Sequence, residues 1–261
     1  MKLTSPNPSA GLCISSHGNV AYTHLALEAL KRNEPDLRVL VYDNYSNAQM
    51  ELQLLAKLYN ADFATSDQAH RKHFATLDAI AGSLKWALAA GLDIVVHSDS
   101  AMIINRPFVT GLQELFHNLT YPTVTGTDAQ FLEWFRTELM AMHVNSWTAS
   151  GACKHLTMSL DQLPDVVCNE AARIAMKFAH SQDDTISHAN NSAHPGCDYL
   201  VRSLRSFPRH SWEAAFANWP LLGLARNVQV PGVFWENSHS INDYYQLSVT
   251  FGLPYTPNAF N

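Results

Sequence analysis

Apolar runs and amphipathic segments alternate along the first 107 residues of the chain. Four short apolar runs are typical of buried strands: 11–15, 37–43, 61–65 and 93–97. Between them, three segments repeat apolar residues at helical spacing: 19–33, 46–60 and 76–91. Asn19 and Ser46 suit the starts of the first two helices, and Gly91 suits the end of the third. This alternation predicts an α/β fold with a mostly parallel sheet covered by flanking helices.

After Pro107 the pattern is less regular. The expected elements are helices near 108–118, 168–180 and 198–206, a strand at 121–126, a strand or loop at 138–146, and one or two strands in the tail from 227 onward. No linker, repeat or low-complexity stretch divides the chain. We therefore predict a single domain over residues 1–261, in which about 1–107 bind a ligand and about 108–261 complete the site.

Composition narrows the classes of partner. The chain carries 17 Lys and Arg against 23 Asp and Glu, a net charge of -6, which argues against general nucleic-acid binding. The four cysteines, at positions 13, 153, 168 and 197, form no CxxC pair and fit reduced thiols, so we expect a cytoplasmic protein. Neither a signal-peptide-like stretch nor a run of about 18 apolar residues occurs, so no transmembrane segment is expected.

Polar clusters follow three of the predicted strands: SSHGN at 15–19, DNYS at 43–46 and HSDS at 97–100. The carboxyl ends of parallel strands meet at one edge of a sheet, where open α/β folds bind ligands. Local explanations exist as well, because Ser16 or Asn19 can cap one helix and Ser46 the next, and Asp43 can cap a turn. Capping alone does not require a carboxylate after two different strands, so the clusters together predict a ligand site.

The segments LRVLVYDNYS (37–46) and SLKWALAAGLDIVVHSDSAMIINRP (83–107) carry a resemblance to a known family. They resemble the second strand, and the helix and strand leading into the aspartate motif, of GT-A-fold nucleotide-sugar glycosyltransferases, especially the family-2-like ones. The resemblance covers roughly residues 11–107 and implies a GT-A-type, Rossmann-like sheet. It also implies the residues that contact the donor: Ser15, Ser16, His17, Asp43, His97, Ser98 and Asp99.

His97 stands where this family commonly has an aspartate. The motif contacts the ribose and, through a divalent ion, the donor diphosphate, and Asp99 still offers the ion a hard oxygen ligand. Imidazole suits Mn²⁺ better than Mg²⁺, so Mn²⁺ is the expected cofactor. Alternatively, His97 donates a hydrogen bond to the ribose or a phosphate, or it is a histidine packed beneath the site. The resemblance further implies a second metal ligand near the C-terminus, which is His239 here, with Glu236 as its nearest alternative.

Three more residues enter the predicted site through their order along the chain. Arg71 and Lys72 lie where related enzymes often carry a basic residue near the diphosphate, although a solvated surface pair has the same pattern. Trp147 falls on the acceptor side of such folds, where it could stack on a sugar ring; an isolated tryptophan also suits the core.

Together these positions predict a metal-assisted, inverting glycosyltransferase that moves a sugar from a nucleoside-diphosphate sugar to an acceptor hydroxyl, on a glycan. The expected general base is Asp198, which also suits the first turn of a helix, and Asp183 and Asp184 compete for the role. A nucleotidyltransferase is a second hypothesis, although CISSHGNVAYTHL lacks the Gly-rich, basic loop that binds a triphosphate. A non-catalytic nucleotide- or carbohydrate-binding module is a third, which His97 keeps open.

Overall fold

The computed structural model describes residues 8–68, 72–100, 102–104, 107–118, 123–128, 131–158, 162–181 and 234–236. The elements in chain order are β1 (Ala10–Ser16), α1 (Val20–Asn33), β2 (Arg38–Asp43), α2 (Gln49–Leu58), β3 (Asp62–Thr65), α3 (Lys72–Ala89), β4 (Ile94–Asp99), β5 (Met102–Ile104), α4 (Val109–Asn118), β6 (Thr123–Asp128), β7 (Phe131–His143), α5 (Val144–Ala149), α6 (Ala152–Met158), α7 (Pro164–Ser181) and β8 (Phe234–Glu236).

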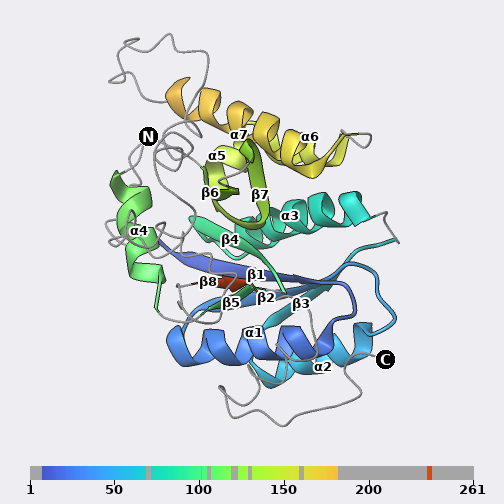
Figure 1. Ribbon diagram of the computed structural model, residues 1–261. Coiled ribbons are helices and arrows are strands. Elements are labelled where there is room, and N and C mark those ends of the chain that lie inside the picture. Colours follow the sequence, from blue (N-terminus) through green and yellow to red (C-terminus); the bar gives the residue numbers. More distant parts are fainter. Residues whose placement is uncertain are drawn as a thin grey trace.

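The strands form a six-stranded sheet in the order β3-β2-β1-β4-β7-β6 and a separate two-stranded sheet of β5 and β8 (Figure 1). Strands β1 to β4 pair in parallel, whereas β7 runs antiparallel to both β4 and β6. The predicted α/β fold with a mostly parallel sheet is therefore confirmed. The chain leaves β1 towards β2 and β3 and then returns to β4 on the other side, so the strand order reverses at β1.

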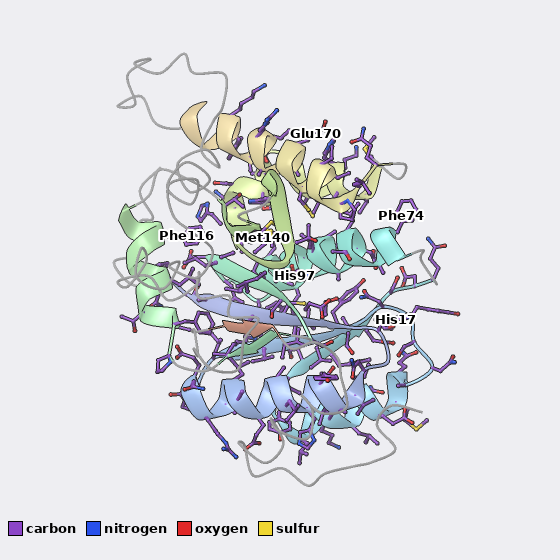
Figure 2. The ribbon with its side chains drawn as sticks, in the orientation of Figure 1. His17, Phe74, His97, Phe116, Met140 and Glu170 are labelled. Carbon is purple, nitrogen blue, oxygen red and sulfur yellow. The ribbon has the colours of Figure 1, made fainter. Side chains whose placement is uncertain are left out.

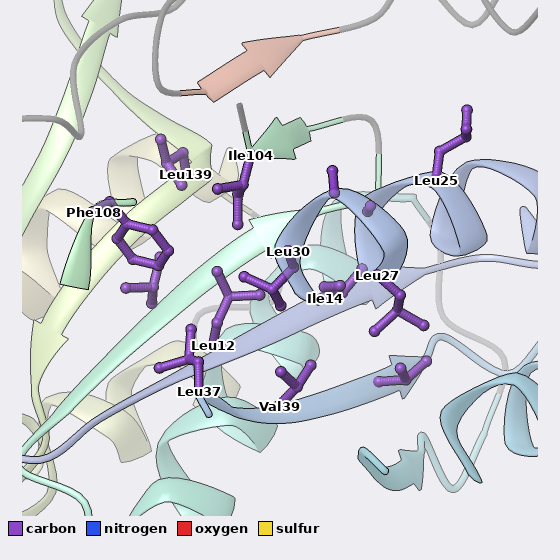
Figure 3. Close-up of a cluster of buried hydrophobic side chains, with 14 of the residues drawn as sticks. Leu12, Ile14, Leu25, Leu27, Leu30, Leu37, Val39, Ile104, Phe108 and Leu139 are labelled. Carbon is purple, nitrogen blue, oxygen red and sulfur yellow. The ribbon is translucent and has the colours of Figure 1, made fainter. Parts of the chain in front are cut away.

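Helices cover both faces of the large sheet (Figure 1). On one face, Leu12 and Ile14 of β1 pack in a cluster with α1, α2 and α4, to which α1 contributes Leu25, Leu27 and Leu30 (Figure 3). On the other face, side chains of α3, α5, α6 and α7 pack on Val95 of β4 and on β7. The two layers fix the sheet from both sides, so its carboxyl edge is held by a rigid scaffold.

Two glycines are needed where this scaffold is tight. A Cβ at position 82 would lie 2.4 Å from the ring of Tyr42, so glycine lets α3 approach β2 closely. Gly18 has a φ of 74°, and it turns the chain from β1 into α1, where Asn19 accepts a hydrogen bond from the backbone of Tyr22. The expected cap at Asn19 is confirmed.

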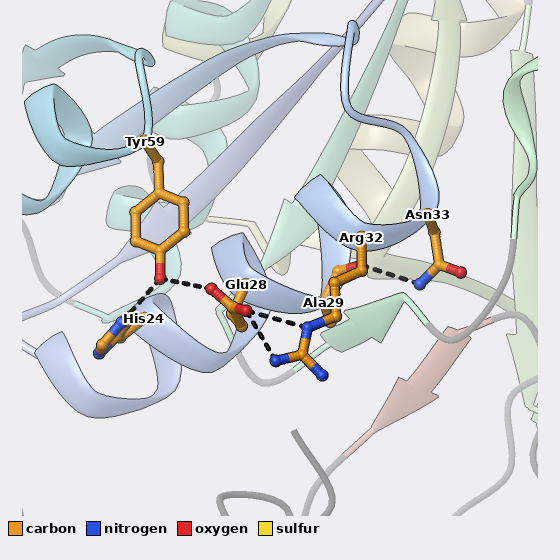
Figure 4. A network of polar contacts seen from close by, with 6 residues as sticks. All are labelled: His24, Glu28, Ala29, Arg32, Asn33 and Tyr59. Atoms are coloured by element: carbon orange, nitrogen blue, oxygen red, sulfur yellow. Dashed lines mark hydrogen bonds and ion pairs between the residues drawn. The ribbon is translucent and has the colours of Figure 1, made fainter. Parts of the chain in front are cut away.

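A polar network joins the outer side of α1 to the end of α2 (Figure 4). The Tyr59 hydroxyl donates to Glu28 Oε2 at 2.8 Å and lies 2.8 Å from His24 Nε2. Arg32 Nε donates to Glu28 Oε1 at 2.9 Å. These contacts hold the carboxyl-terminal end of α2 against α1.

The second half of the chain differs most from expectation. The expected strand or loop at 138–146 is the end of the longer β7, and α5 begins at Val144. The short α6 and β5 were not anticipated, β8 lies in the tail where one or two strands were expected, and the expected helix at 198–206 lies outside the described residues. Within the described part of the chain, no helix is both long and apolar enough to cross a membrane.

Candidate functional site at the carboxyl edge of the sheet

The carboxyl ends of four parallel strands are level with one another. Backbone hydrogen bonds continue the ladder one step past the strands, from Ser66 to Asp43, from Asn44 to Ser16 and from Ser100 to Ser15, at 2.8–2.9 Å. The three polar clusters therefore meet at one edge, as the strand pattern predicts. This edge includes the point where the strand order reverses, which is where open α/β sheets bind ligands.

The two serines at the end of β1 have different surroundings. Ser15 is in register with Tyr42 and Asp99, and its Oγ accepts a hydrogen bond from Asn44 Nδ2 at 3.0 Å. Ser16 is buried, and its Oγ lies 2.9 Å from Thr23 Oγ1, which donates to the carbonyl oxygen of Asn19 at 2.7 Å. Ser16 thus anchors α1, whereas Ser15 belongs to the polar layer at the edge.

Asp43 uses its two carboxylate oxygens differently. Oδ2 accepts a hydrogen bond from the backbone of Ser46 at 3.0 Å and so shapes the turn after β2. Oδ1 is buried and has no hydrogen-bond partner among the described residues, and the same holds for Oδ1 of Asn44. A buried acceptor without a donor costs about 1–3 kcal/mol, so both atoms favour a ligand that brings N–H or O–H groups.

His17 is an exposed residue that lies beside Asp43 and Asn44. Its Nδ1 lies 2.9 Å from the carbonyl oxygen of Asn44, which makes Nδ1 the donor in the neutral or charged ring. The contact links the β1–α1 loop to the β2–α2 loop. His17 is therefore at the edge, as predicted, and its side chain holds two of the three clusters together.

His97 lies below the edge rather than on it. It is 1% exposed, in register with Cys13 of β1 and Met140 of β7, and Figure 2 shows it in the interior beside Met140. Burial lowers the pKa of His97 to about 3, so the ring is neutral at pH 7. Its Nδ1 has no partner among the described residues. Of the three roles considered, this placement fits the histidine packed beneath the site best, because the register puts His97 two residues below Asp99 and the edge.

Ser98 and Asp99 complete β4 at the edge. Ser98 is buried and in register with Ile14 and Leu139, whereas Asp99 is only partly buried and in register with Ser15. The hydroxyl of Ser100 lies 3.5 Å from Asp99 Oδ1. Asp99 is therefore the carboxylate of the aspartate motif that reaches the edge.

The side chains described at this edge provide one ligand for a hard cation, the carboxylate of Asp99, and not a complete metal site. Within the ranges that the structure describes, no three His, Cys, Asp or Glu side chains converge. Asp43 and Asp99 are separated by β1, which puts them about two strand spacings, or roughly 9–10 Å, apart. An ion bound to Asp99 would thus need a further ligand from elsewhere in the chain.

The short strand β8 indicates which part of the chain would supply such a metal-ligating side chain. It pairs antiparallel with β5, which begins three residues after Asp99, and Met102 is opposite Glu236. The backbone of the tail therefore passes beside the segment that follows the aspartate motif. His239 lies three residues further on and outside the described residues.

Trp147 corrects one prediction. Its side chain is fully buried in α5, and its indole N–H donates to Thr123 Oγ1 at 2.8 Å. A ring packed in the core has no face on which a sugar can stack, so the expected contact with an acceptor is wrong. The alternative that Trp147 belongs to the core is confirmed.

Other predicted site residues lie where the structure gives no side-chain information. Lys72 begins α3, but its side chain is outside the described residues. The remaining positions lie outside them altogether: Arg71, Asp183, Asp184, Asp198 and His239.

Two residues beside the edge were not among the predicted site residues, although Asn44 belongs to the DNYS cluster. Asn44 contributes an unpartnered acceptor, and its position next to Asp43 was the available signal. Tyr42 points to the α3 side, where its hydroxyl donates to Asp78 Oδ2 at 2.6 Å. Burial and the Asp78 carboxylate raise the pKa of Tyr42, so the phenol stays protonated and ties α3 to β2.

Comparison with known proteins shows the fold. No protein-family model matches the chain, and no curated protein matches it significantly. A crystal structure of an active-site mutant of LgtC has a TM-score of 0.52 at 13% identity, over 95% of this chain and 98% of that one. The galactosyltransferase LgtC in complex with donor and acceptor sugar analogs has a TM-score of 0.51 at 11% identity, over the same shares. The fold is of the GT-A type.

The resemblance stated from the sequence is thereby confirmed at the level of the fold. TarS of S. aureus in complex with UDP is also similar, with a TM-score of 0.48 and 9% identity over 80% of this chain and 75% of that one. At such identities the likeness concerns the GT-A architecture. The chemistry has to be argued from the side chains at the edge.

Proposed function

We propose that this protein is a glycosyltransferase that binds a nucleoside-diphosphate sugar at the carboxyl edge of β2, β1 and β4. The observation that carries the proposal is the pair of buried acceptors without a partner among the described residues, Asp43 Oδ1 and Asn44 Oδ1, at the end of β2 and next to β1, where the strand order of a GT-A-type sheet reverses. A nucleoside offers the N–H groups of a base and the hydroxyls of a ribose, which are the donors that these atoms lack.

The diphosphate then extends towards β4. Asp99 is in register with Ser15, so a ligand that crosses the end of β1 reaches from Asp43 to Asp99. A divalent ion, with Mn²⁺ preferred, would be held by Asp99 and by His239 or Glu236, and when bound it supplies charge stabilisation for the leaving diphosphate. The pairing of β5 with β8 supports this assignment, because it brings the tail to Asp99's own segment.

Transfer itself needs a base and an acceptor. In the proposed single displacement, a carboxylate, for which we propose Asp198, takes the proton of the acceptor hydroxyl. The acceptor oxygen attacks the anomeric carbon as the bond from that carbon to the diphosphate breaks. The products are an inverted glycoside, on a glycan acceptor, and a nucleoside diphosphate.

A thermal-shift comparison tests the proposal. UDP, GDP, CDP and ADP are each added with and without Mn²⁺, and at least one is expected to raise the Tm, since ligands of the native state stabilise it. Asp99→Ala is expected to abolish the additional shift that Mn²⁺ causes. Glu51→Ala, at an exposed position of α2, serves as the matched control. If none of the four nucleotides stabilises the wild-type protein in either condition, the proposal is wrong.

Adding nucleoside triphosphates to this comparison, and assays of pyrophosphate and sugar release, separates the other hypotheses. A nucleotidyltransferase would be stabilised by nucleoside triphosphates and would release pyrophosphate from them. A binding module would be stabilised by a nucleoside diphosphate, yet it would hydrolyse or transfer no sugar from any donor. Because His97 stands where the family commonly has an aspartate, Asp99 is the one carboxylate of this motif, which is why sugar release from the donors has to be measured together with binding.

A further inference from the structure

Tyr45 has an unusual backbone conformation for its residue type. Its φ is 57°, in the left-handed region that bulky side chains rarely adopt, and it follows directly after Asp43 and Asn44. Asn60, at the end of α2, is the other non-glycine residue with a positive φ in the described part of the chain. Asparagine tolerates that conformation, so Asn60 is ordinary and Tyr45 is strained.

The surrounding loop holds Tyr45 in this conformation. On its amino-terminal side, Asn44 donates to Ser15 and its carbonyl oxygen contacts His17. On its carboxyl-terminal side, the Ser46 backbone donates to Asp43, and Ser46 Oγ accepts from the backbone of Ala48 at 3.2 Å. Strain that contacts on both sides maintain is typical of functional sites.

The strained conformation presents an aromatic ring at the edge. Tyr45 is 51% exposed, whereas Asp43 is fully buried and Asn44 is 8% exposed. The Tyr45 hydroxyl makes no hydrogen bond to the residues described in the structure. The loop therefore combines an uncovered aromatic ring with two acceptors that lack donors, within three consecutive residues.

We propose that Tyr45 stacks on the base of the donor nucleotide while Asp43 and Asn44 accept hydrogen bonds from its N–H groups. A nucleobase is a planar ring with N–H donors at its edge, so it can use both features of the loop at once. Tyr45 then determines the affinity for the base and leaves the diphosphate contacts to other residues. This inference rests on the proposed nucleotide-sugar site and assigns the residue that recognises the face of the base.

Nucleotide affinity and stability of Tyr45 variants test the inference, because loss of the ring should weaken binding without lowering stability. Tyr45→Gly removes the ring and relieves the positive φ, so the Tm of the free protein should stay equal or rise. The Kd for the nucleoside diphosphate that binds wild type best should nevertheless weaken about 10-fold or more by calorimetry. Tyr45→Phe keeps the ring and should remain within about threefold of wild type.

Two controls make the result specific. Asn60→Gly relieves a positive φ away from the edge and should leave nucleotide affinity unchanged. Inorganic pyrophosphate, which has no base, should bind wild type and Tyr45→Gly equally. If wild type binds a nucleoside diphosphate and Tyr45→Gly binds it as tightly, the role of Tyr45 is overturned while the proposed function stands. If wild type binds no nucleoside diphosphate, both are overturned.

Discussion

At the scale of single residues, the two carboxylate oxygens of Asp43 have different surroundings. One oxygen fixes the turn through Ser46, and the other has no donor among the described residues. A carboxylate buried to this degree is retained only where its hydrogen bonds are completed. Because the described residues supply a partner to one oxygen only, the proposed ligand would supply a partner to the other.

Asp43→Asn should separate these two functions. The amide oxygen can still accept from the Ser46 backbone, so the Tm should fall by only a few degrees, but an NH₂ donor then replaces the unpartnered oxygen. Loss of the acceptor should weaken nucleoside-diphosphate binding by roughly 5- to 100-fold, following about 1–3 kcal/mol for a broken buried hydrogen bond. Calorimetry gives the Kd and a thermal melt gives the Tm. Unchanged affinity in Asp43→Asn would remove Asp43 from the site.

At the scale of elements, α5 has a cap that depends on protonation. Nδ1 of His143, at the end of β7, accepts from the Ser146 backbone at 3.3 Å and lies 2.7 Å from its hydroxyl. Burial lowers the pKa of His143 to about 4, against the opposing effect of Asp93. The cap therefore requires the neutral ring, because a proton on Nδ1 would remove the acceptor.

The sign of the pH dependence follows from this lowered pKa. As the pH falls below about 6.5, His143 takes up a proton in the unfolded chain and not in the folded one, so stability is lost between pH 6.5 and pH 4. His143→Asn keeps a good cap without titrating, and it should lose about 1–2 kcal/mol less than wild type between pH 7 and pH 5. Urea unfolding at the two pH values measures this difference. Equal losses in both proteins would contradict the assignment of the cap.

Elements with long, regular patterns were predictable from the sequence, and elements defined by their partners were not. Strands β1 to β4 are short apolar runs, and helices α1 to α3 repeat apolar residues at helical spacing, because these elements pack against the core. Helix α6 has seven residues, too few for a helical period to show, and β5 has only three. These short elements form because a partner completes them.

The same distinction applies to the site. Strand ends and their polar residues could be read along the chain, so the edge with Ser15, Asp43 and Asp99 was predictable. The depth of His97 depends on its register with Cys13 and Met140, which only the assembled sheet defines. The left-handed backbone of Tyr45 was also hidden, since a tyrosine gives no sign of a positive φ.

At the scale of the whole molecule, the parallel strands give the sheet two chemically different edges. The carboxyl edge carries the polar clusters, whereas at the opposite edge Ser9 and Asp93 satisfy each other, with Ser9 N donating to Asp93 Oδ2 at 2.8 Å. Helices cover both faces between these edges, so the ends of the strands are where a ligand meets the sheet. Ligand binding should therefore affect local structure at the carboxyl edge of the sheet only.

Hydrogen exchange with mass spectrometry can test this asymmetry. A saturating nucleoside diphosphate should slow exchange in peptides that cover 15–19, 43–48 and 98–100, because the ligand contacts the loops whose backbone groups extend the ladder past the strands. Peptides that cover 91–94 at the opposite edge should exchange as in the free protein, and they serve as the internal control. Amides that exchange by local opening are slowed where the ligand contacts the folded state, whereas amides that exchange only by global unfolding are slowed throughout the protein. Equal slowing at 91–94 and 43–48 of the amides that exchange by local opening would contradict binding at the carboxyl edge.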